Sequence, residues 1–260
     1  MMARVTPLAQ NALLAGSAFL AGAINSLAGG GTLLTYPALL AAGVSPIHAN
    51  ATSTLSLVQG QLAAAWGYRR TLRGAGKLLL ALALPSLAGS LLGALLLLHL
   101  TEHSFALLVP WLILGATLLF ILSDRLRSLG RDRPEQPLTA RRLAVLIAVQ
   151  FAVAIYGGFF GAGQSILMLA TLGLCGLRDL DLMQGLKNFA AAVINAVAMS
   201  LFIFGGLIEW RPAIVMALAA SLGGYAGARA AQRIPKRAAR ATIISIGLAA
   251  AVWTFYKTLH

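Results

Sequence analysis

Charged residues are scarce in this chain, and acidic residues are the scarcest of all. Only 10% of the 260 residues are charged, with 7 Asp or Glu against 20 Lys or Arg, while 59% are hydrophobic. A soluble domain is typically about 25% charged. A soluble protein this apolar would leave apolar surface in water, and several apolar runs reach the roughly 20 residues that cross a bilayer. The composition therefore indicates a multi-pass membrane protein.

Thiols and metal-binding patterns are also lacking. The lone cysteine, Cys175, excludes an internal disulfide, a Cys-x-x-Cys pair and a thiolate metal cluster. The four histidines (His48, His99, His103 and His260) show no metal-ligand spacing. The chain also has no nucleotide-binding loop, Gly-x-Ser-x-Gly elbow or His-Glu-x-x-His motif. We therefore expect no enzyme, no cofactor and no metal site.

The charge that is present lies in short connections between apolar segments. Three of these connections are basic, at residues 69–77, 123–142 and 229–240, and they carry most of the net charge of +13. Because cytoplasmic loops are enriched in Lys and Arg, we expect these loops in the cytoplasm and the chain in the inner membrane. Basic residues split among loops do not form a nucleic-acid surface. The expected partners are lipid, a small anion and, as an open possibility, further copies of the chain.

The apolar segments fall into two related halves. Residues 1–122 form the first repeat, residues 123–142 a basic linker and residues 143–260 the second repeat, with four apolar segments in each half. The stretch that begins at Phe19 aligns with the stretch that begins at Phe151. We therefore expect an all-α polytopic membrane protein of about eight segments, and weak internal symmetry of this kind is typical of transporters. The apolar run near the N-terminus continues past any cleavage site, which favours an uncleaved first segment.

The first segment of each half has an unusual length. Residues 8–43 and 143–175 are too long for one crossing and too short for two with a turn, and glycines interrupt both. We expect two half-length helices that meet at a glycine turn, where the backbone lines protein or a wet cavity. If segment 143–175 enters the membrane and returns to the same side, and the first half has the same shape, each half makes three net crossings. An odd number of crossings starts the second half on the opposite side of the membrane, so the repeats are inverted. Eight simple spans with parallel repeats are the alternative, which places the basic residues 229–240 outside.

The second segment of each half carries polar side chains at helical spacing. Ser45 and Pro46 start the first of these helices, and Asp181 with Gln184 resembles a capping box at the start of the second. The stripe residues of the first helix are Asn50, Ser53 and Gln61, and those of the second are Lys187 and Asn195, with Gln61 and Asn195 at equivalent positions. Hydrogen bonds between helices are the plain explanation of such stripes. A transport pathway is the functional one.

Lys187 is the basic residue placed deepest within an expected span. A cation at membrane depth is costly and is by default a functional candidate, and it suits an anionic substrate. The alternative is that its long side chain reaches the membrane surface, since it lies about two turns from the helix start.

The glycine breaks supply the remaining candidate residues. A helix that restarts inside the membrane presents its N–H groups and its positive dipole end, which suit an anion. Glycines that merely allow close helix packing are the alternative. The candidates are Asn25, Gly29, Gly30, Gly31 and Thr32 in the first break and Gly161, Gly163, Gln164 and Ser165 in the second.

In these motifs the sequence resembles the TauE/SafE family of sulfite and organosulfonate exporters. The matching residues are Gly29–Gly31 with Pro37, then Ala49, Thr52 and Ser53, then Gly157, Gly158, Gly161 and Gly163, and finally Lys187. Gln164 departs from the glycine that the family commonly has there. The resemblance implies transport of a small sulfur-containing anion, such as sulfite or a sulfonate, by alternating access around a midplane site. A passive anion channel and a membrane accessory protein for cofactor or metal maturation are the alternatives.

Overall fold

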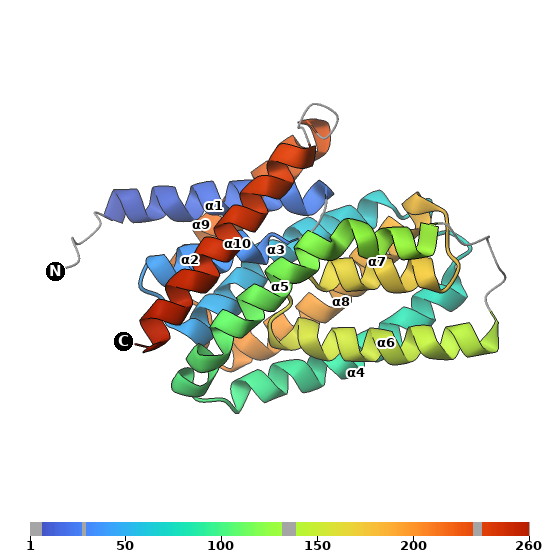
Figure 1. Cartoon of the computed structure of the whole chain (residues 1–260), viewed down its shortest axis with the longest axis horizontal. Helices are drawn as coiled ribbons and strands as arrows, with labels where there is room; N and C mark the ends of the chain where they lie inside the picture. Colours follow the sequence, from blue (N-terminus) through green and yellow to red (C-terminus); the bar gives the residue numbers. More distant parts are fainter. Residues whose placement is uncertain (1–6, 28–29, 132–138, 231–235, 260) are drawn as a thin grey trace.

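The computed structural model of the chain describes residues 7–27, 30–131, 139–230 and 236–259. These residues form helices joined by short turns, without a strand among them, which confirms the all-helical prediction (Figure 1). The helices are α1 (Pro7–Leu27), α2 (Thr32–Ala41), α3 (Pro46–Gly67), α4 (Gly76–Leu98), α5 (Glu102–Arg131), α6 (Ala140–Phe159), α7 (Gln164–Leu174), α8 (Leu180–Phe204), α9 (Trp210–Ala230) and α10 (Lys236–Leu259). Both α5 and α6 extend into the stretch expected as a linker.

The outer surface of the bundle suits a lipid environment. Large apolar side chains such as Leu80, Leu84 and Leu91 on α4 and Trp111 on α5 are exposed. Of the described helices, α4, α5 (over Glu102–Ser123), α6 and α8 are each long and apolar enough to cross a membrane. These observations establish a helical protein with several membrane-crossing helices, while the number of eight segments stays a prediction.

Each overlong segment is broken at its glycines, as expected. The first breaks between α1 and α2, and the second between α6 and α7. Gly30, Gly161 and Gly163 have φ between 76° and 95°, a conformation that L side chains rarely adopt, so the helix stops there. The expectation of two half-length helices was wrong for the first member of each pair. α1 and α6 have 21 and 20 residues, whereas α2 and α7 have 10 and 11, because the glycines lie past the middle of each segment.

One end of the bundle, which we call the basic end, gathers residues from both halves. Tyr68, after the end of α3, lies beside Gly185 in the first turns of α8. Directly after α7, the thiol of Cys175 donates to the backbone oxygen of Arg142 at 3.7 Å, which places the start of α6 next to the end of α7. The basic turn that begins at Arg69 and the start of α6 therefore lie at the same end.

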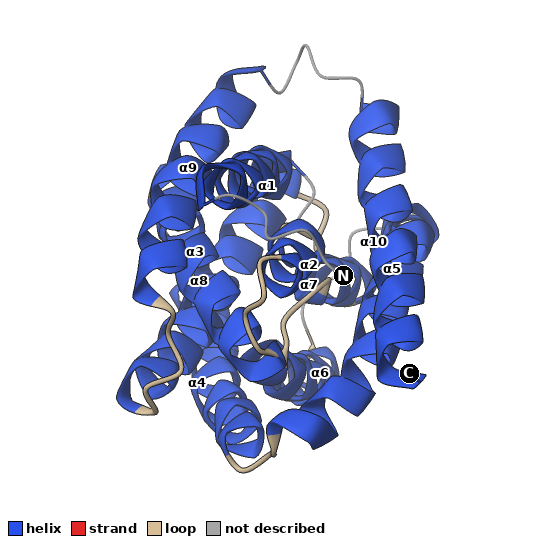
Figure 2. Cartoon of the chain, turned by 90° about the vertical axis from the view of Figure 1, so that its left-hand side faces the viewer, coloured by secondary structure: helices blue, strands red, loops and turns tan. Residues whose placement is uncertain are grey.

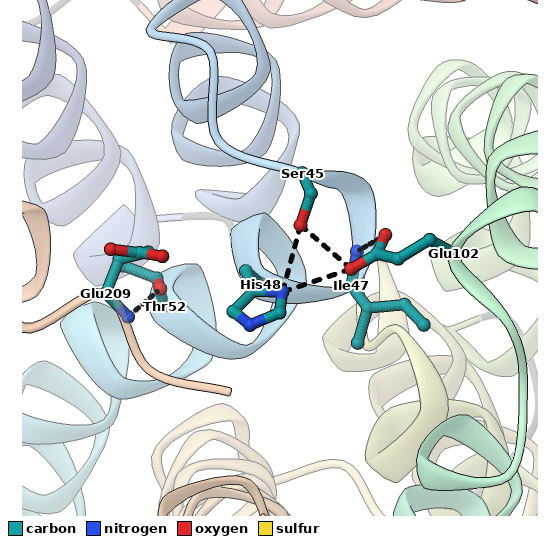
Figure 3. A network of polar contacts seen from close by, with 6 residues as sticks. All are labelled: Ser45, Ile47, His48, Thr52, Glu102 and Glu209. Carbon is teal, nitrogen blue, oxygen red and sulfur yellow. Dashed lines mark hydrogen bonds and ion pairs between the residues drawn. The ribbon is translucent and has the colours of Figure 1, made fainter. Parts of the chain in front are cut away.

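Other contacts define the opposite end. The side chain of Gln10 near the start of α1 donates to the backbone oxygen of Ala42 at the end of α2. The carboxylate of Glu102 at the start of α5 accepts hydrogen bonds from Ser45 Oγ (2.8 Å) and the backbone N–H of Ile47 (3.0 Å) and lies 3.0 Å from His48 Nδ1 (Figure 3). The turns before α3 and α5 are thereby joined.

The same end includes the turn between α8 and α9. The backbone N–H of Glu209 donates to Thr52 Oγ1 at 3.0 Å (Figure 3). Lys257, near the end of α10, lines one cavity with Pro46 and His103. The opposite end therefore holds the start of α1 and the ends of α2, α4, α8 and α10.

Two helix starts were predicted, with mixed outcome. α3 begins at Pro46 after Ser45 as expected, although the Ser45 hydroxyl bonds Glu102 rather than the helix backbone. For α8 the predicted capping pair was wrong. Asp179 is the N-cap, and its Oδ1 accepts from the N–H groups of Asp181 and Leu182, because its extended backbone directs the carboxylate at the first turn.

The helices surround the two short ones. α1 packs on α9, α4 packs on α6, α5 packs on α10, and α3 packs on α8 and α9. Figure 2 shows α2 and α7 in the middle of the bundle, with the longer helices around them. This arrangement brings both glycine breaks into the interior.

Candidate functional site

The two glycine breaks meet in one narrow polar pocket. Nine of the residues predicted for the site line it, namely Asn25, Gly30, Thr32, Gln61, Gly161, Gly163, Gln164, Ser165 and Asn195. Its volume of about 20 Å³ is little more than a water molecule requires. Residues that lie up to 170 positions apart in the chain thus face one small space.

Each break is organised by local hydrogen bonds. The backbone N–H of Gly31 donates to Asn25 Oδ1 at 2.9 Å, so the side chain from α1 holds the start of α2 in place. The N–H of Leu33 bonds Gly30 O at 3.0 Å, and the N–H of Ile166 bonds Gly163 O at 2.9 Å. Some of the N–H groups expected to be available are therefore used within the turns. The positive dipole ends of α2 and α7 still point into the same region.

A direct bond between α3 and α8 closes one side of the pocket. Asn195 Nδ2 donates to Gln61 Oε1. The sequence alignment predicts that these two residues are equivalent. Gln164, the residue that departs from the family pattern, is buried against Gly157, where a Cβ atom would collide with its Oε1. The second break therefore carries an amide packed into the helix before it.

A wider cavity of about 430 Å³ adjoins the narrow pocket on the side of the basic end. Asn25, Gln61 and Ser165 line both spaces. The wide cavity reaches Tyr68 at the end of α3, and Lys187 lines it with only 3% of its surface exposed. The Lys187 side chain is thus inside the bundle and does not extend along its outer surface.

Three of the described predicted residues, Gly31, Asn50 and Ser53, lie outside both cavities. Asn50 is buried and its Nδ2 donates to the backbone oxygen of Phe159 at 2.9 Å, so it joins α3 to the second break. Ser53 shares a 2.6 Å hydrogen bond with Thr35 on α2. Gly31 borders the first break without lining the pocket, and Gly29 falls outside the described residues.

Several lining residues were missed by the sequence reasoning. Thr54 and Phe160 line the narrow pocket, and Tyr68, Asn188 and Ser221 line the wide cavity. Thr54 lies one helical turn after Asn50, so the spacing could have indicated it. Ser221 lies on α9, and only the packing of α9 against α1 and α3 brings it to the cavity.

Aromatic side chains fill the space between the narrow pocket and the opposite end. Phe160 packs edge-on against Tyr36 with ring centres 5.3 Å apart and against Phe105 at 6.4 Å. Phe105 also packs against Phe159 at 5.6 Å. Tyr36 and Phe105 are fully buried, and Phe160 is 3% exposed. We call these four residues the aromatic plug, and one of them, Phe160, also lines the narrow pocket.

The electrostatics of both spaces favour negative charge. Neither lining contains a described Asp or Glu. At the mouth of the wide cavity, burial raises the pKa of the Tyr68 phenol, and the Asp181 carboxylate raises this pKa further, so Tyr68 is a neutral donor. Among the described residues, no group of three His, Cys, Asp or Glu could hold a metal ion.

Long apolar helices around a polar interior define the class as a polytopic membrane protein with a cavity suited to a solute. The chain belongs to the Sulfite exporter TauE/SafE family, whose sequence profile matches residues 14–254. It is therefore a membrane transporter of that family, as the resemblance indicated. No solved structure matches the chain.

Curated relatives extend this assignment. The probable membrane transporter protein ORF9 of Sinorhizobium sp is 30% identical over 94% of this chain and 92% of its own length. The probable membrane transporter protein YfcA of Escherichia coli strain K12 is 35% identical, over 82% of this chain and 77% of its own. A probable membrane transporter protein of Haemophilus influenzae is 33% identical over 81% of each chain.

Proposed function

We propose that the protein carries a small anion, sulfite or an organosulfonate or another sulfur-containing anion, by alternating access around the narrow pocket. One observation carries the proposal. Both glycine breaks, Gln61 and Asn195 line one pocket, and the cavity that adjoins it contains the buried Lys187. An oxyanion needs hydrogen-bond donors and positive potential, and this combination offers both.

The supply of donors supports an anion over a cation. The amides of Asn25 and Asn195 and the hydroxyls of Thr32 and Ser165 lie around the pocket. The ammonium of Lys187 would balance the charge of the bound anion, and because Lys187 is buried, solvent screens this attraction only weakly. A cation site would instead be expected to contain a carboxylate.

The sizes of the two spaces suggest the order of events. The wide cavity could admit a hydrated oxyanion from the basic end, whereas the narrow pocket holds about one water. We therefore propose that this structure corresponds to the state that is accessible from the basic end. Transport would then require the pocket to widen and the aromatic plug to part.

We also propose that residues 1–122 and 143–260 are inverted repeats joined by residues 123–142. The start of α1 lies by the end of α2 at the opposite end, and the start of α6 lies by the end of α7 at the basic end. The pair α1 and α2 thus enters and returns at the opposite end, and the pair α6 and α7 enters and returns at the basic end. The three long helices that follow then give three crossings in each half, in opposite directions.

Packing supports the same symmetry. Suppose that helices α1 to α5 of the first half are equivalent, in order, to helices α6 to α10 of the second. The contact between α1 and α9 is then equivalent to the contact between α6 and α4. The α3–α8 and α5–α10 contacts each join two equivalent helices. At the first two, Gly223 lies against the backbone oxygen of Phe19, and Gly89 lies against that of Phe151. Phe19 and Phe151 are equivalent in the repeat alignment, so corresponding residues make corresponding contacts.

The orientation follows from the charge. The basic turn after α3 and the start of α6 lie at the basic end, and α9 runs toward the same end through Tyr225, which lines the wide cavity with Tyr68. We propose that this end faces the cytoplasm of a bacterial inner membrane.

A passive anion channel is the main rival. The aromatic plug supports a carrier over a channel, because its contacting rings pack beside the pocket on the side of the opposite end. A role in metal maturation has no corresponding observation, since the described residues offer no metal-ligand group.

The proposal is tested by uptake of labelled sulfite and of a labelled sulfonate into proteoliposomes. Lys187→Gln should reduce uptake at least about tenfold, because it removes a buried charge next to the site. Lys77→Gln, which removes a lysine from the first turn of α4, is the matched control and should retain uptake. Flux that saturates and shows counterflow indicates a carrier, and flux that does neither indicates a channel. Unchanged uptake in Lys187→Gln would refute the role of its charge.

A further inference from the structure

A further cavity lies on the lipid-facing side of the bundle, apart from the narrow pocket and the wide cavity. It has a volume of about 400 Å³ and is formed where α3, the turn after it, α4 and α8 meet. Leu62, Leu72, Leu79 and Phe189 form an apolar wall. We call this space the lateral groove. It shares no lining residue with either cavity of the transport pathway.

Two arginines lie at the basic end of the lateral groove. Arg69 and Arg73 both line it, and they are four residues apart in a turn where the N–H of Leu72 bonds Tyr68 O. That spacing places them on the same side of the turn. Neither makes an ion pair with a carboxylate within the described part of the chain. Both are exposed, so the groove combines an apolar wall with a positive rim.

Trp66 fixes the position of this rim. The Arg69 guanidinium stacks over the Trp66 ring, 4.9 Å from its centre, and donates to the Trp66 backbone oxygen at 3.1 Å. Trp66 is 70% exposed and lines the groove. Exposed tryptophan next to arginine is typical of the level of lipid headgroups, where the ring is half in apolar surroundings.

We propose that the lateral groove binds one anionic phospholipid, with an acyl chain along the apolar wall and the phosphate between Arg69 and Arg73. Charge complementarity favours a phospholipid over a second copy of this chain, because a copy would bring mainly basic loops to a basic rim. Basic pockets between helices at the cytoplasmic side recognise lipid headgroups by the same chemistry. The groove would then tether the turn between α3 and α4 to the membrane surface.

Native mass spectrometry of the full chain in detergent tests this proposal, with phosphatidylglycerol and phosphatidylcholine of matched acyl chains as the two probes. The Arg69→Gln/Arg73→Gln variant should lose affinity for phosphatidylglycerol at least about tenfold, since each arginine contributes to headgroup attraction. The matched control is Arg70→Gln/Lys77→Gln, which removes the same charge from the same turn outside the groove. It should stay within about twofold of wild type.

A second variant tests the apolar wall. Leu62→Ser should weaken retention of phosphatidylglycerol, whereas Leu91→Ser, at an exposed leucine on α4 outside the groove, should not. Size-exclusion profiles and circular dichroism check that each variant is folded. Equal losses of phosphatidylglycerol affinity in the two double variants would overturn the proposal, because the attraction would then depend on overall charge and not on the groove. Equal retention of both lipids, or a dimer that excludes lipid from wild type, would also overturn it.

Discussion

The side-chain amide of Asn195 on α8 donates a hydrogen bond to the side-chain oxygen of Gln61 on α3, beside the narrow pocket. The two residues are 134 positions apart, and the proposed repeats make them equivalent. A bond between equivalent residues lies on the axis that would relate the halves. The bond thus couples the proposed repeats at the point where the proposed substrate binds.

Removing either partner of this bond should impair transport. Asn195→Ala and Gln61→Ala should each lower sulfite uptake in proteoliposomes by roughly three- to tenfold, because each leaves the other amide without a buried partner, at about 1 kcal/mol. Since residues in contact are not additive, the double variant should be no worse than the more affected single variant. Losses that multiply in the double variant would contradict a shared role.

Gly157 should be intolerant of a side chain. A Cβ atom at this position would collide with Gln164 Oε1 and contact Ile194, so Gly157→Ala must move the amide that lines the pocket. We expect a loss of about 1–3 kcal/mol in the free energy of unfolding together with reduced uptake. Gly115→Ala is the control, since no atom lies within 4 Å of its Cβ position, and it should be neutral or stabilising. Normal uptake in Gly157→Ala would show that the position of Gln164 is unimportant.

Truncating the aromatic plug should cause a leak. Phe160→Ala removes the ring that contacts both Tyr36 and Phe105, which should open the pocket toward the opposite end. Efflux of sulfite from preloaded proteoliposomes should then rise and lose saturation. Phe255→Ala is the matched control, because it loses an edge-on ring contact with Trp111 outside the pathway. If Phe160→Ala folds normally and shows no increase in sulfite efflux, the barrier to sulfite lies elsewhere in the protein.

Cysteine labelling should reveal which end has access to the wide cavity. In a Cys175→Ser background, which has no other thiol, Ser221→Cys should react with an impermeant maleimide in inside-out vesicles and be protected by a transported sulfonate, which unlike sulfite does not react with the maleimide. Thr101→Cys, exposed at the opposite end, should react in right-side-out vesicles instead. Reaction of Ser221→Cys from the right-side-out face alone would reverse the proposed orientation.

The breaks themselves were predictable because glycine is a local signal. Three adjacent glycines inside an apolar run, and their counterpart near Gly163, indicated where the helices stop, and the structure begins α2 at Thr32 and α7 at Gln164. The expectation of equal helix lengths was wrong because it ignored that the glycines lie past the middle of each segment. The cap at Asp179 was missed because Asp181 carries the same side chain two residues on.

The polar stripe on α3 shows the limit of spacing alone. Asn50, Ser53 and Gln61 are on related helical positions, yet Asn50 and Ser53 bond neighbouring helices while Gln61 reaches the pocket. Helical spacing places residues on a face, and the neighbouring helix decides whether that face meets protein or a cavity. Lys187 is a similar case, since its burial beside the wide cavity depends on α3 and α9.

By itself the sequence determined that this protein is helical and membrane-embedded and where its helices break, because hydrophobic composition and glycine act locally along the chain. Tertiary structure alone decided that both glycine breaks share one pocket, that Phe160 packs beside it against Tyr36 and Phe105, and that Arg69 and Arg73 border a separate groove. These relationships join residues far apart in the chain. They arise from the packing of α1 on α9 and of α4 on α6, which side-chain spacing within one helix does not encode.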